Sequence, residues 1–246
     1  MADSGSIRIN KYLSESGFCS RRMADQFIEE GRVTINDKIP DIGTKVMPSD
    51  VVKVDGKHVL EPRKEHVYIA FNKPPGIVCT TDTRSERNNI IDYIGFPERI
   101  FPIGRLDKAS EGLIFLTSDG DIVNKILRAG NNHEKEYIVR VDKPLTDDFL
   151  HQMSDGVPIL DTVTAKCEVE QFDEYDFSII LKQGMNRQIR RMCEHLGYDV
   201  LKLRRIRIMN IELDMPIGHW RYLSGSEMEE ISRMTANSSK TFEEPD

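Results

Sequence analysis

The feature that most constrains the fold is a series of strand-like segments in the chain after residue 67. These segments are rich in β-branched and aromatic residues, and they read VYIAFN, GLIFLTS, EKEYIVRV and EYDFSIIL. Two segments between them, DIVNKILRAG and PLTDDFLHQMSDGV, have helical character. The strands are irregularly spaced, without the strand–helix alternation of a parallel sheet and without a glycine-rich dinucleotide motif. The sequence therefore predicts the α+β class, with a mixed, largely antiparallel sheet flanked by helices.

The first 60 residues have a different organisation. Two short helical segments come first, and Ser20 is a good N-cap for the second helix, whereas Gly31 can end it. Two strand-like stretches, VTIN and VVKV, follow, and each is succeeded by turn residues. The charged, proline-containing stretch EPRKEH then reads as a linker. We therefore predict a small α+β domain over residues 1–62 and a larger domain over residues 63–246.

Basic residues are concentrated in one part of the chain. The net charge of the whole chain is −7, yet residues 182–207 contain eight Lys or Arg residues against two acidic ones. Such segregation places a local basic patch on an acidic body. The overall charge disfavours a simple nucleic-acid-binding protein, whereas the patch suits a polyanionic partner. An ordinary charged helix face, which would mix its signs, is the alternative.

Several classes of protein are disfavoured by what the sequence lacks. No apolar run reaches the roughly 18 residues of a membrane span, and the N-terminal stretch MADSGSIRIN has no apolar signal region. The four cysteines lie far apart without a C-x-x-C pair, and the histidines have no metal-ligand spacing. We therefore expect a cytoplasmic protein with reduced thiols, no membrane contact and no metal site.

Two residues in the larger domain are candidates for chemistry. The stretch FPIGRLDKASEGLIFLTSDG places Asp107 in a loop just before a strand, between Gly104 and Gly112. A turn role explains an aspartate there, and a reactive carboxylate is the alternative. Tyr137 alternates with Val139 along a strand and is therefore expected to point inward, where core packing alone would explain it.

A third candidate lies on the helix predicted in QGMNRQIRRMCEHLG. At about 100° per residue, one face of this helix collects apolar residues, namely Ile189, Met192, Cys193 and Leu196. Arg187 and Arg191 lie opposite, towards solvent or phosphate. Arg190 sits at the border, where it can extend outward into water. Alternatively, it can reach a partly buried carboxylate and hold it ionised through charge and bidentate hydrogen bonds.

Two arginines are unusual in the small domain. Arg21 and Arg22 occupy the first turn of its second helix, where cations oppose the helix dipole. The same helix end attracts phosphate, and two arginines would strengthen that attraction. Two solvated arginines remain the alternative reading.

The small domain resembles a known RNA-binding module. The stretch INKYLSESGFCSRRMADQFIEEGRVTINDK is similar to the S4 domain of ribosomal protein S4 and of many RNA-modifying enzymes. The resemblance covers roughly residues 7–55. It implies that an RNA backbone lies along five basic residues, namely Arg8, Lys11, Arg21, Arg22 and Arg32.

The larger domain carries a second resemblance. After the S4-like module come GRLDKASEGLIFLTSDG, KEYIV and QGMNRQIRRMCEHLGYDVLKLRRIRI, in this order. Together they resemble the RNA pseudouridine synthases that carry an N-terminal S4 domain and modify ribosomal RNA. The match runs from Arg8 to about Ser226, and the likeness is greatest to enzymes acting on 23S rRNA. It implies an isomerase that needs no cofactor and no metal.

The same resemblance implies roles for individual residues. Asp107 stands at the position of the catalytic aspartate, and Arg190 at that of the basic residue that pairs with it. Tyr137 stands where a tyrosine stacks on the flipped base. Arg105 matches an arginine that rearranges the RNA around this base, and Leu203 matches an apolar residue of the pocket. Arg187 and Arg191 are further candidates for RNA binding.

The partner is therefore expected to be ribosomal RNA, with tRNA as an additional candidate substrate, and the protein is expected to act as a monomer. Two alternatives stay open from the sequence. One is a synthase for small-subunit rRNA, which shares the architecture. The other, of a different class, is a non-catalytic RNA-binding protein of ribosome assembly, which would have no need of Asp107, Tyr137 and Arg190 together.

Overall fold

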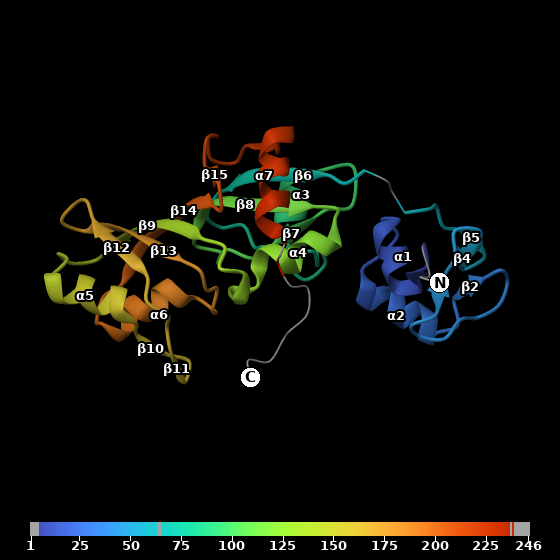
Figure 1. Cartoon of the computed structure of the whole chain (residues 1–246), viewed down its shortest axis with the longest axis horizontal. Coiled ribbons are helices and arrows are strands. Elements are labelled where there is room, and N and C mark those ends of the chain that lie inside the picture. Colours follow the sequence, from blue (N-terminus) through green and yellow to red (C-terminus); the bar gives the residue numbers. More distant parts are fainter. Residues whose placement is uncertain (1–4, 63–64, 237, 239–246) are drawn as a thin grey trace. The chain divides into compact units, whose positions relative to one another are not determined.

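The computed structural model describes residues 5–62, 65–236 and 238. The chain forms two compact units (Figure 1), one of residues 1–66 with 97–99 and the other of residues 67–96 with 100–246. None of the helices in the described stretches combines the length and the apolar character that a bilayer crossing needs.

The N-terminal unit packs two helices against short strands around one apolar core. Its helices are α1 (Ile9–Glu15) and α2 (Arg21–Glu29). Its strands are β1 (Ile7–Arg8), β2 (Val33–Ile35), β3 (Lys45–Val46), β4 (Val52–Val54) and β5 (Lys57–His58). Strands β2, β4 and β5 form one antiparallel sheet, and β1 pairs with β3.

Local sequence signals set the ends of α2, as expected. The Ser20 hydroxyl accepts the backbone N–H of Met23 at 3.2 Å, which satisfies one of the donors left open at the helix start. At the other end Gly31 has φ +68°, a conformation that glycine adopts without strain.

The C-terminal unit is built on a nine-stranded sheet with the order β12-β13-β9-β14-β8-β6-β16, to which β7 and β15 add at β8 and β14. The neighbouring strands are antiparallel except for β14 and β8, which run parallel, so the expected mixed, largely antiparallel sheet is confirmed. The central strands are β6 (Tyr68–Lys73), β8 (Glu111–Thr117), β9 (Lys135–Val141), β13 (Asp176–Leu181) and β14 (Val200–Ile208). The peripheral strands are β7 (Phe101–Ile103), β12 (Glu168–Gln171), β15 (Ile211–Glu212) and β16 (Trp220–Tyr222), and β10 (Pro158–Ile159) pairs separately with β11 (Thr162–Val163).

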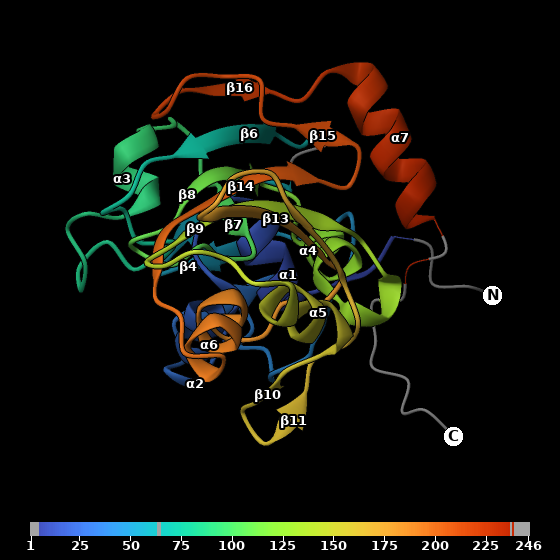
Figure 2. The ribbon, with the colours of Figure 1, turned by 90° about the vertical axis from the view of Figure 1, so that its left-hand side faces the viewer.

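Helices cover the two faces of this sheet unequally. One face packs against α3 (Ile90–Ile94), α5 (Asp147–Asp155) and α6 (Gln188–His195), and α5 and α6 lie on the same side of the strands (Figure 2). The other face packs against α4 (Gly120–Leu127) and α7 (Gly225–Thr235), but only around β6, β7, β8 and the end of β14. On this second face the side chains of Arg140 and Arg204, from β9 and β14, are exposed.

The parallel pair at the centre of the sheet depends on a glycine. Gly112 of β8 lies opposite Arg205 of β14 and has φ +109°. A Cβ atom at this position would lie 2.2 Å from the carbonyl oxygen of Arg205, well inside contact distance. Only glycine therefore lets β8 and β14 approach as they do.

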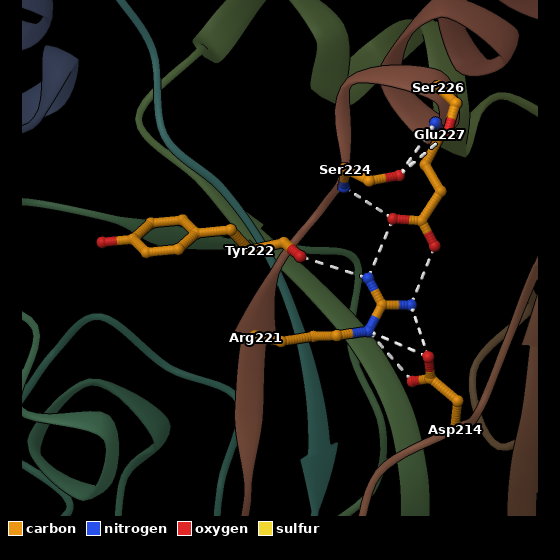
Figure 3. A network of polar contacts seen from close by, with 6 residues as sticks. All are labelled: Asp214, Arg221, Tyr222, Ser224, Ser226 and Glu227. Atoms are coloured by element: carbon orange, nitrogen blue, oxygen red, sulfur yellow. Dashed lines mark hydrogen bonds and ion pairs between the residues drawn. The ribbon is translucent and has the colours of Figure 1, made fainter.

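The start of α7 is fixed by an extended ion-pair network (Figure 3). Arg221 Nε donates to both carboxylate oxygens of Asp214, at 3.0 and 3.1 Å, and its two terminal nitrogens donate to Glu227 at 2.8 Å each. Glu227 also accepts the backbone N–H of Ser224, whose hydroxyl accepts the Glu227 N–H in return, forming a capping box. Every polar group of the network is matched, as in a structural ion pair.

Candidate active site

A cavity of about 380 Å³ opens in the C-terminal unit where the loop after β7 faces β9, β14 and the start of α6. Its volume lies in the range typical of small-molecule sites. The cavity is lined by residues from five separate stretches of chain, namely 104–107 with 110, 127, 135 with 137, 181 with 183–189, and 203 with 205. Of the residues singled out from the sequence, Asp107, Tyr137, Leu203, Arg105 and Arg187 all contribute to this lining.

Asp107 lies in the loop between β7 and β8, and the segment after β6 holds this loop in place. The backbone N–H of Gly76 donates to the carbonyl oxygen of Lys108 at 2.7 Å. The N–H of Leu106 donates to the Cys79 sulfur at 3.4 Å. The residues on both sides of Asp107 are therefore fixed by the turn that follows β6, and the carboxylate is presented to the cavity from a braced backbone.

Arg190 is brought to Asp107 by α6. Its Nε lies 3.6 Å from the Asp107 Oδ2, while its terminal nitrogens donate to the carbonyl oxygen of Val200 at 3.0 Å and to the Ser110 hydroxyl at 3.3 Å. The bidentate pairing considered from the sequence is absent, because both terminal nitrogens bind other acceptors. Burial lowers the pKa of Arg190, and the nearby Asp107 opposes this shift. Arg190 thus supplies a fixed positive charge beside the carboxylate without occupying its hydrogen-bonding positions.

The Asp107 carboxylate keeps its acceptors available. About a third of the side chain, 34%, is exposed, and no described residue donates a hydrogen bond to either carboxylate oxygen. A carboxylate that only stabilised the loop would be expected to accept nearby N–H groups. This one faces an open cavity instead, with a cation on one side, which is an arrangement suited to reaction with a bound ligand.

Tyr137 and Leu203 form an apolar wall of the cavity. Tyr137 belongs to the buried face of β9, which it shares with Val139, so the inward orientation expected from the strand pattern is observed. Leu203 lies on β14, paired with Val139 across the sheet, and is also buried. An aromatic ring beside an aliphatic side chain gives a flat base a face to stack on.

Two lining residues were missed by the sequence reasoning. Lys135 and Arg205 are both buried at the cavity, two positions from Tyr137 and from Leu203 respectively. A signal for them existed, because residues two apart on a strand share a face. The strand pattern placed Tyr137 on the inner face, and the family resemblance placed Leu203 in the pocket, but neither inference was extended to the two cations that share these faces.

The other arginines singled out from the sequence, Arg105, Arg187 and Arg191, differ in whether they line the cavity. Arg105 and Arg187 are exposed at the cavity, and Arg187 has φ +50° at the start of α6. Arg191 does not line the cavity. Its Nε donates to the carbonyl oxygen of Asn186, and its Nη2 to the Asn186 side-chain oxygen, at 3.1 Å each. Arg191 therefore braces the loop before α6, and a phosphate would have to compete with Asn186 for it.

Four candidate RNA contacts lie in the N-terminal unit. Arg21 and Arg22 are exposed in the first turn of α2, as the sequence indicated, and Arg8 is exposed at the N-cap position of α1. Lys11 lies within 3.4 Å of Glu15, one turn further along α1. An exposed pair of this kind contributes little to stability.

Arg32 has a different environment. Its Nε and Nη2 donate to the two carboxylate oxygens of Asp55 at 2.9 and 2.6 Å, and its Nη1 donates to Glu30 at 3.0 Å. The guanidinium also lies 4.1 Å from the ring centre of Phe27. Arg32 is thus held by a two-pronged pair with the Asp55 carboxylate.

Comparison with known protein families accounts for this arrangement. The family model described as RNA pseudouridylate synthase matches residues 67–195, and the S4 domain model matches residues 7–52. The chain belongs to the RNA pseudouridylate synthase family. As a pseudouridine synthase it is an isomerase, and the activity expected from the sequence is confirmed.

Similar pseudouridine synthases cover almost the whole chain. The dual-specificity RNA pseudouridine synthase RluF of Escherichia coli strain K12 is 57% identical over 97% of this chain and 83% of its own length. The ribosomal large subunit pseudouridine synthase B of Bacillus subtilis strain 168 is 31% identical over 96% of this chain and 99% of its own. A crystal structure of a pseudouridylate synthase superposes with a TM-score of 0.67 at 27% identity, covering 92% of this chain and 99% of that one. The fold expected from the sequence is thereby confirmed.

Proposed function

We propose that this pseudouridine synthase isomerises a specific uridine of large-subunit (23S) ribosomal RNA, with Asp107 as the catalytic carboxylate. The observation that carries the assignment of Asp107 is its carboxylate, which lines the 380 Å³ cavity together with Tyr137, lies 3.6 Å from Arg190 and accepts no hydrogen bond from a described residue.

The chemistry assigns a task to each of these groups. Uridine becomes pseudouridine when the N1–C1′ bond breaks, the uracil turns, and C5 bonds to C1′. A carboxylate can begin this either by attacking C1′ or by removing the C2′ proton, and Asp107 has the free oxygens for both. Arg190 stabilises the negative charge that Asp107 carries before the reaction and recovers after it.

The other lining residues would hold the substrate. The target base has to leave its stack before a carboxylate can reach its sugar, and Tyr137 with Leu203 offers the flipped base an apolar wall. Arg105 and Arg187 are exposed at the same cavity, where they would meet the phosphates that flank the flipped nucleotide. In this proposal the enzyme uses neither a metal nor a cofactor.

The N-terminal unit would increase the affinity for RNA. We assign RNA phosphates to Arg8, Lys11, Arg21 and Arg22, which lie at the beginnings of α1 and α2. The domains that we propose are residues 1–62 for RNA binding and residues 63–246 for catalysis. The enzyme would work as a monomer in the cytoplasm, where ribosomal RNA is assembled into subunits.

The choice of target rests on the similar proteins. One of them is named for the large ribosomal subunit, and another is named as having dual specificity. These names support 23S rRNA as the principal substrate and motivate a second one, for which we propose tRNA. RNA of both kinds presents the splayed, single-stranded bases that flipping enzymes select.

Mapping of pseudouridine across total RNA tests the proposal directly. Carbodiimide adducts on pseudouridine stop reverse transcriptase, so RNA is compared from cells that contain the protein, lack it, or contain its Asp107→Asn variant. We expect one stop in 23S rRNA, and a second in tRNA, that depend on the unaltered protein. A dependent stop in small-subunit rRNA instead would overturn the proposed target while leaving the activity intact.

A further inference from the structure

The floor of the active-site cavity is formed by buried cations. Lys135 of β9 and Arg205 of β14 line the cavity with only 7% and 3% of their surface exposed. Lys73 of β6 is fully buried nearby, and its charge acts on the same region. None of the three forms a salt bridge with a carboxylate among the described residues. Buried cations without a counter-ion are costly, which is the first sign that a ligand completes the site.

The hydrogen bonds of Arg205 point to the same conclusion. Its Nε donates to the carbonyl oxygen of Leu113 at 2.6 Å, and its Nη1 lies 3.5 Å from the Tyr137 hydroxyl. Its Nη2 is buried and finds no acceptor among the described residues. A donor left unpaired inside a protein is costly, and because Arg205 lines the cavity, the unpaired donor points to an acceptor that the substrate brings.

Lys135 has spare donors as well. Its ammonium group donates to the carbonyl oxygen of His133 at 3.2 Å, which uses one of three N–H groups. Burial lowers the pKa of Lys135 to about 8, and the neighbouring Arg205 contributes to this shift. At neutral pH the ammonium is still largely charged. Lys73, in contrast, donates to the carbonyl oxygens of Pro74 and Ile77 at 2.8 Å each and braces the turn after β6.

The backbone fixes Arg205 in this position. The carbonyl oxygen of Arg205 lies where a side chain on Gly112 would have to be, so β8 and β14 approach closely at this residue. The guanidinium is therefore carried by a central strand of the sheet, which is a rigid support.

The reaction itself generates the anion that such a floor would hold. When N1–C1′ breaks, the bonding electron pair stays with the base, and the negative charge is shared by N1, O2 and O4 of uracil. This is true whether Asp107 attacks C1′ or takes the C2′ proton. The charge is cancelled when C5 bonds to C1′, the C5 proton is lost, and N1 gains a proton. The carboxylate, or the C2′ proton, is restored in the same step.

We propose that Lys135 and Arg205 bind the oxygens of the detached uracil and stabilise its negative charge while the base turns. The proposal rests on the role of Asp107 given above. In this proposal the Asp107 carboxylate acts on the sugar, and the two cations Lys135 and Arg205 act on the base. A fixed donor increases the rate most when it stabilises a charge that exists only between the breaking of N1–C1′ and the formation of C5–C1′.

A leaving-group experiment tests this assignment. Enzyme in excess is mixed with an rRNA transcript whose target nucleotide is either uridine or 5-fluorouridine, and the loss of the starting nucleoside in one turnover is followed by mass spectrometry. Fluorine withdraws electrons from the ring, so the departing base needs less help from the protein. The variants are Lys135→Met and Arg205→Lys. The matched control is Arg204→Met, which removes a cation from the exposed face of the same strand.

We expect Lys135→Met to slow the conversion of uridine by about 10²-fold, and that of 5-fluorouridine by about tenfold or less. Arg205→Lys keeps the charge but loses the planar fork, so its loss is smaller and has the same dependence on the base. RNA affinity stays within about threefold in both variants, because the charge they stabilise is absent from bound uridine. Arg204→Met matches the unaltered enzyme with either base. Replacing a buried cation by an apolar side chain of similar length preserves the fold.

Three outcomes would overturn the inference. One is an equal loss of rate with both bases. Another is a loss of RNA affinity alone, which would assign the two cations to a phosphate. The third is full activity in both variants. An unaltered enzyme that leaves the transcript unmodified would refute the proposed target and not this inference. The comparison is then made on the transcript that the mapping experiment identifies.

Discussion

Two arginine–carboxylate groups in the C-terminal unit differ in how completely they are paired. Arg221 meets Asp214 and Glu227 through several hydrogen bonds of about 3 Å or less, and the backbone of Ser224 adds another (Figure 3). Arg190 meets Asp107 at one contact of 3.6 Å. In the first group every carboxylate oxygen accepts a hydrogen bond from Arg221, whereas in the second neither oxygen accepts one from a described residue. The difference separates a pair that stabilises the fold from one that keeps a carboxylate available for reaction.

The largest expected effect of the difference between these two groups is on catalytic turnover. Asp107→Asn keeps the size and most hydrogen bonding of the side chain but removes the nucleophile or base, so we expect pseudouridine formation to fall by at least about 10⁴-fold. Folding and RNA affinity should be retained. The measurement is tritium release from rRNA labelled at C5 of uridine, after a check for deamidation. Asp214→Asn, the control, should keep full turnover, and substantial release by Asp107→Asn would remove this carboxylate from the mechanism.

The next largest effect on turnover is expected from removing the positive charge of Arg190. Arg190→Ala is expected to lower turnover by about 10²-fold and RNA affinity only modestly, because it faces Asp107 and not solvent. Arg190→Lys keeps the charge without the planar fork and should be intermediate. Single-turnover rates and binding are measured separately. Arg187→Ala is the control, and a greater loss of turnover there than in Arg190→Ala would reverse the assignment of the helix faces.

Disrupting the Arg221–Asp214–Glu227 network should lower the stability of the fold and not the turnover. Arg221→Ala leaves Asp214 and Glu227 without their main donor, and because the network is only partly buried we expect a loss of about 1–3 kcal/mol in the free energy of unfolding. Turnover at 25 °C should be unchanged. Urea unfolding followed by circular dichroism gives the first quantity, and tritium release gives the second. A loss of turnover without a loss of stability would contradict the comparison.

The same network predicts a dependence on pH. The hydrogen bonds from Arg221 lower the pKa of Glu227 from 4.5 to about 2. Because its folded pKa is the lower one, Glu227 stabilises the fold above pH 4.5, and that contribution is lost as the pH falls towards 2. Glu227→Gln removes the titrating group, so the variant should be less stable than the unaltered protein at pH 6, the difference should be clearly smaller at pH 3, and it should nearly vanish only below pH 2. An unchanged difference across this range would place the stabilisation elsewhere.

The smallest expected effect concerns the N-terminal unit, where cations can be compared in the same way. The Arg21→Ala, Arg22→Ala double variant should weaken RNA binding several-fold and reduce the slope of affinity against salt by about two, one for each phosphate contact. Arg32→Ala should alter the slope less, because its guanidinium is already held by Asp55. Binding is titrated at several salt concentrations. Equal slopes for all proteins would assign the unit to a partner other than RNA.

Much of the fold could be predicted because its signals are local. The N-cap at Ser20, the turn residues of the small domain and the apolar face of α6 all follow from short sequence patterns, and the structure contains them. The prediction of where α4 ends was less accurate. The segment DIVNKILRAG was expected to be helical throughout, but the α-helix stops at Leu127 and a short 3₁₀ turn carries the chain past Gly130. A glycine permits a helix to end but does not fix where it ends.

The site could be predicted only in part, because its geometry is not local. The resemblance to known synthases singled out Asp107, Tyr137 and Arg190, and the structure places Arg190 beside Asp107 and Tyr137 on the same cavity. No sequence pattern could show that Val200 and Ser110 would occupy the terminal nitrogens of Arg190. Those contacts depend on where α6 meets β14, which is decided by packing of the whole unit.

The parallel pairing of β8 with β14 also determines when the enzyme can first become active. Asp107 is synthesised long before Arg205, yet the cavity has no floor until β14 lies beside Gly112. Pairing between residues so far apart in sequence closes a long loop and is a slow step in folding. A growing chain on the ribosome therefore carries Asp107 for about 100 residues of further synthesis before Arg205 is added. Chemistry becomes possible only after the strand that completes the cavity has emerged.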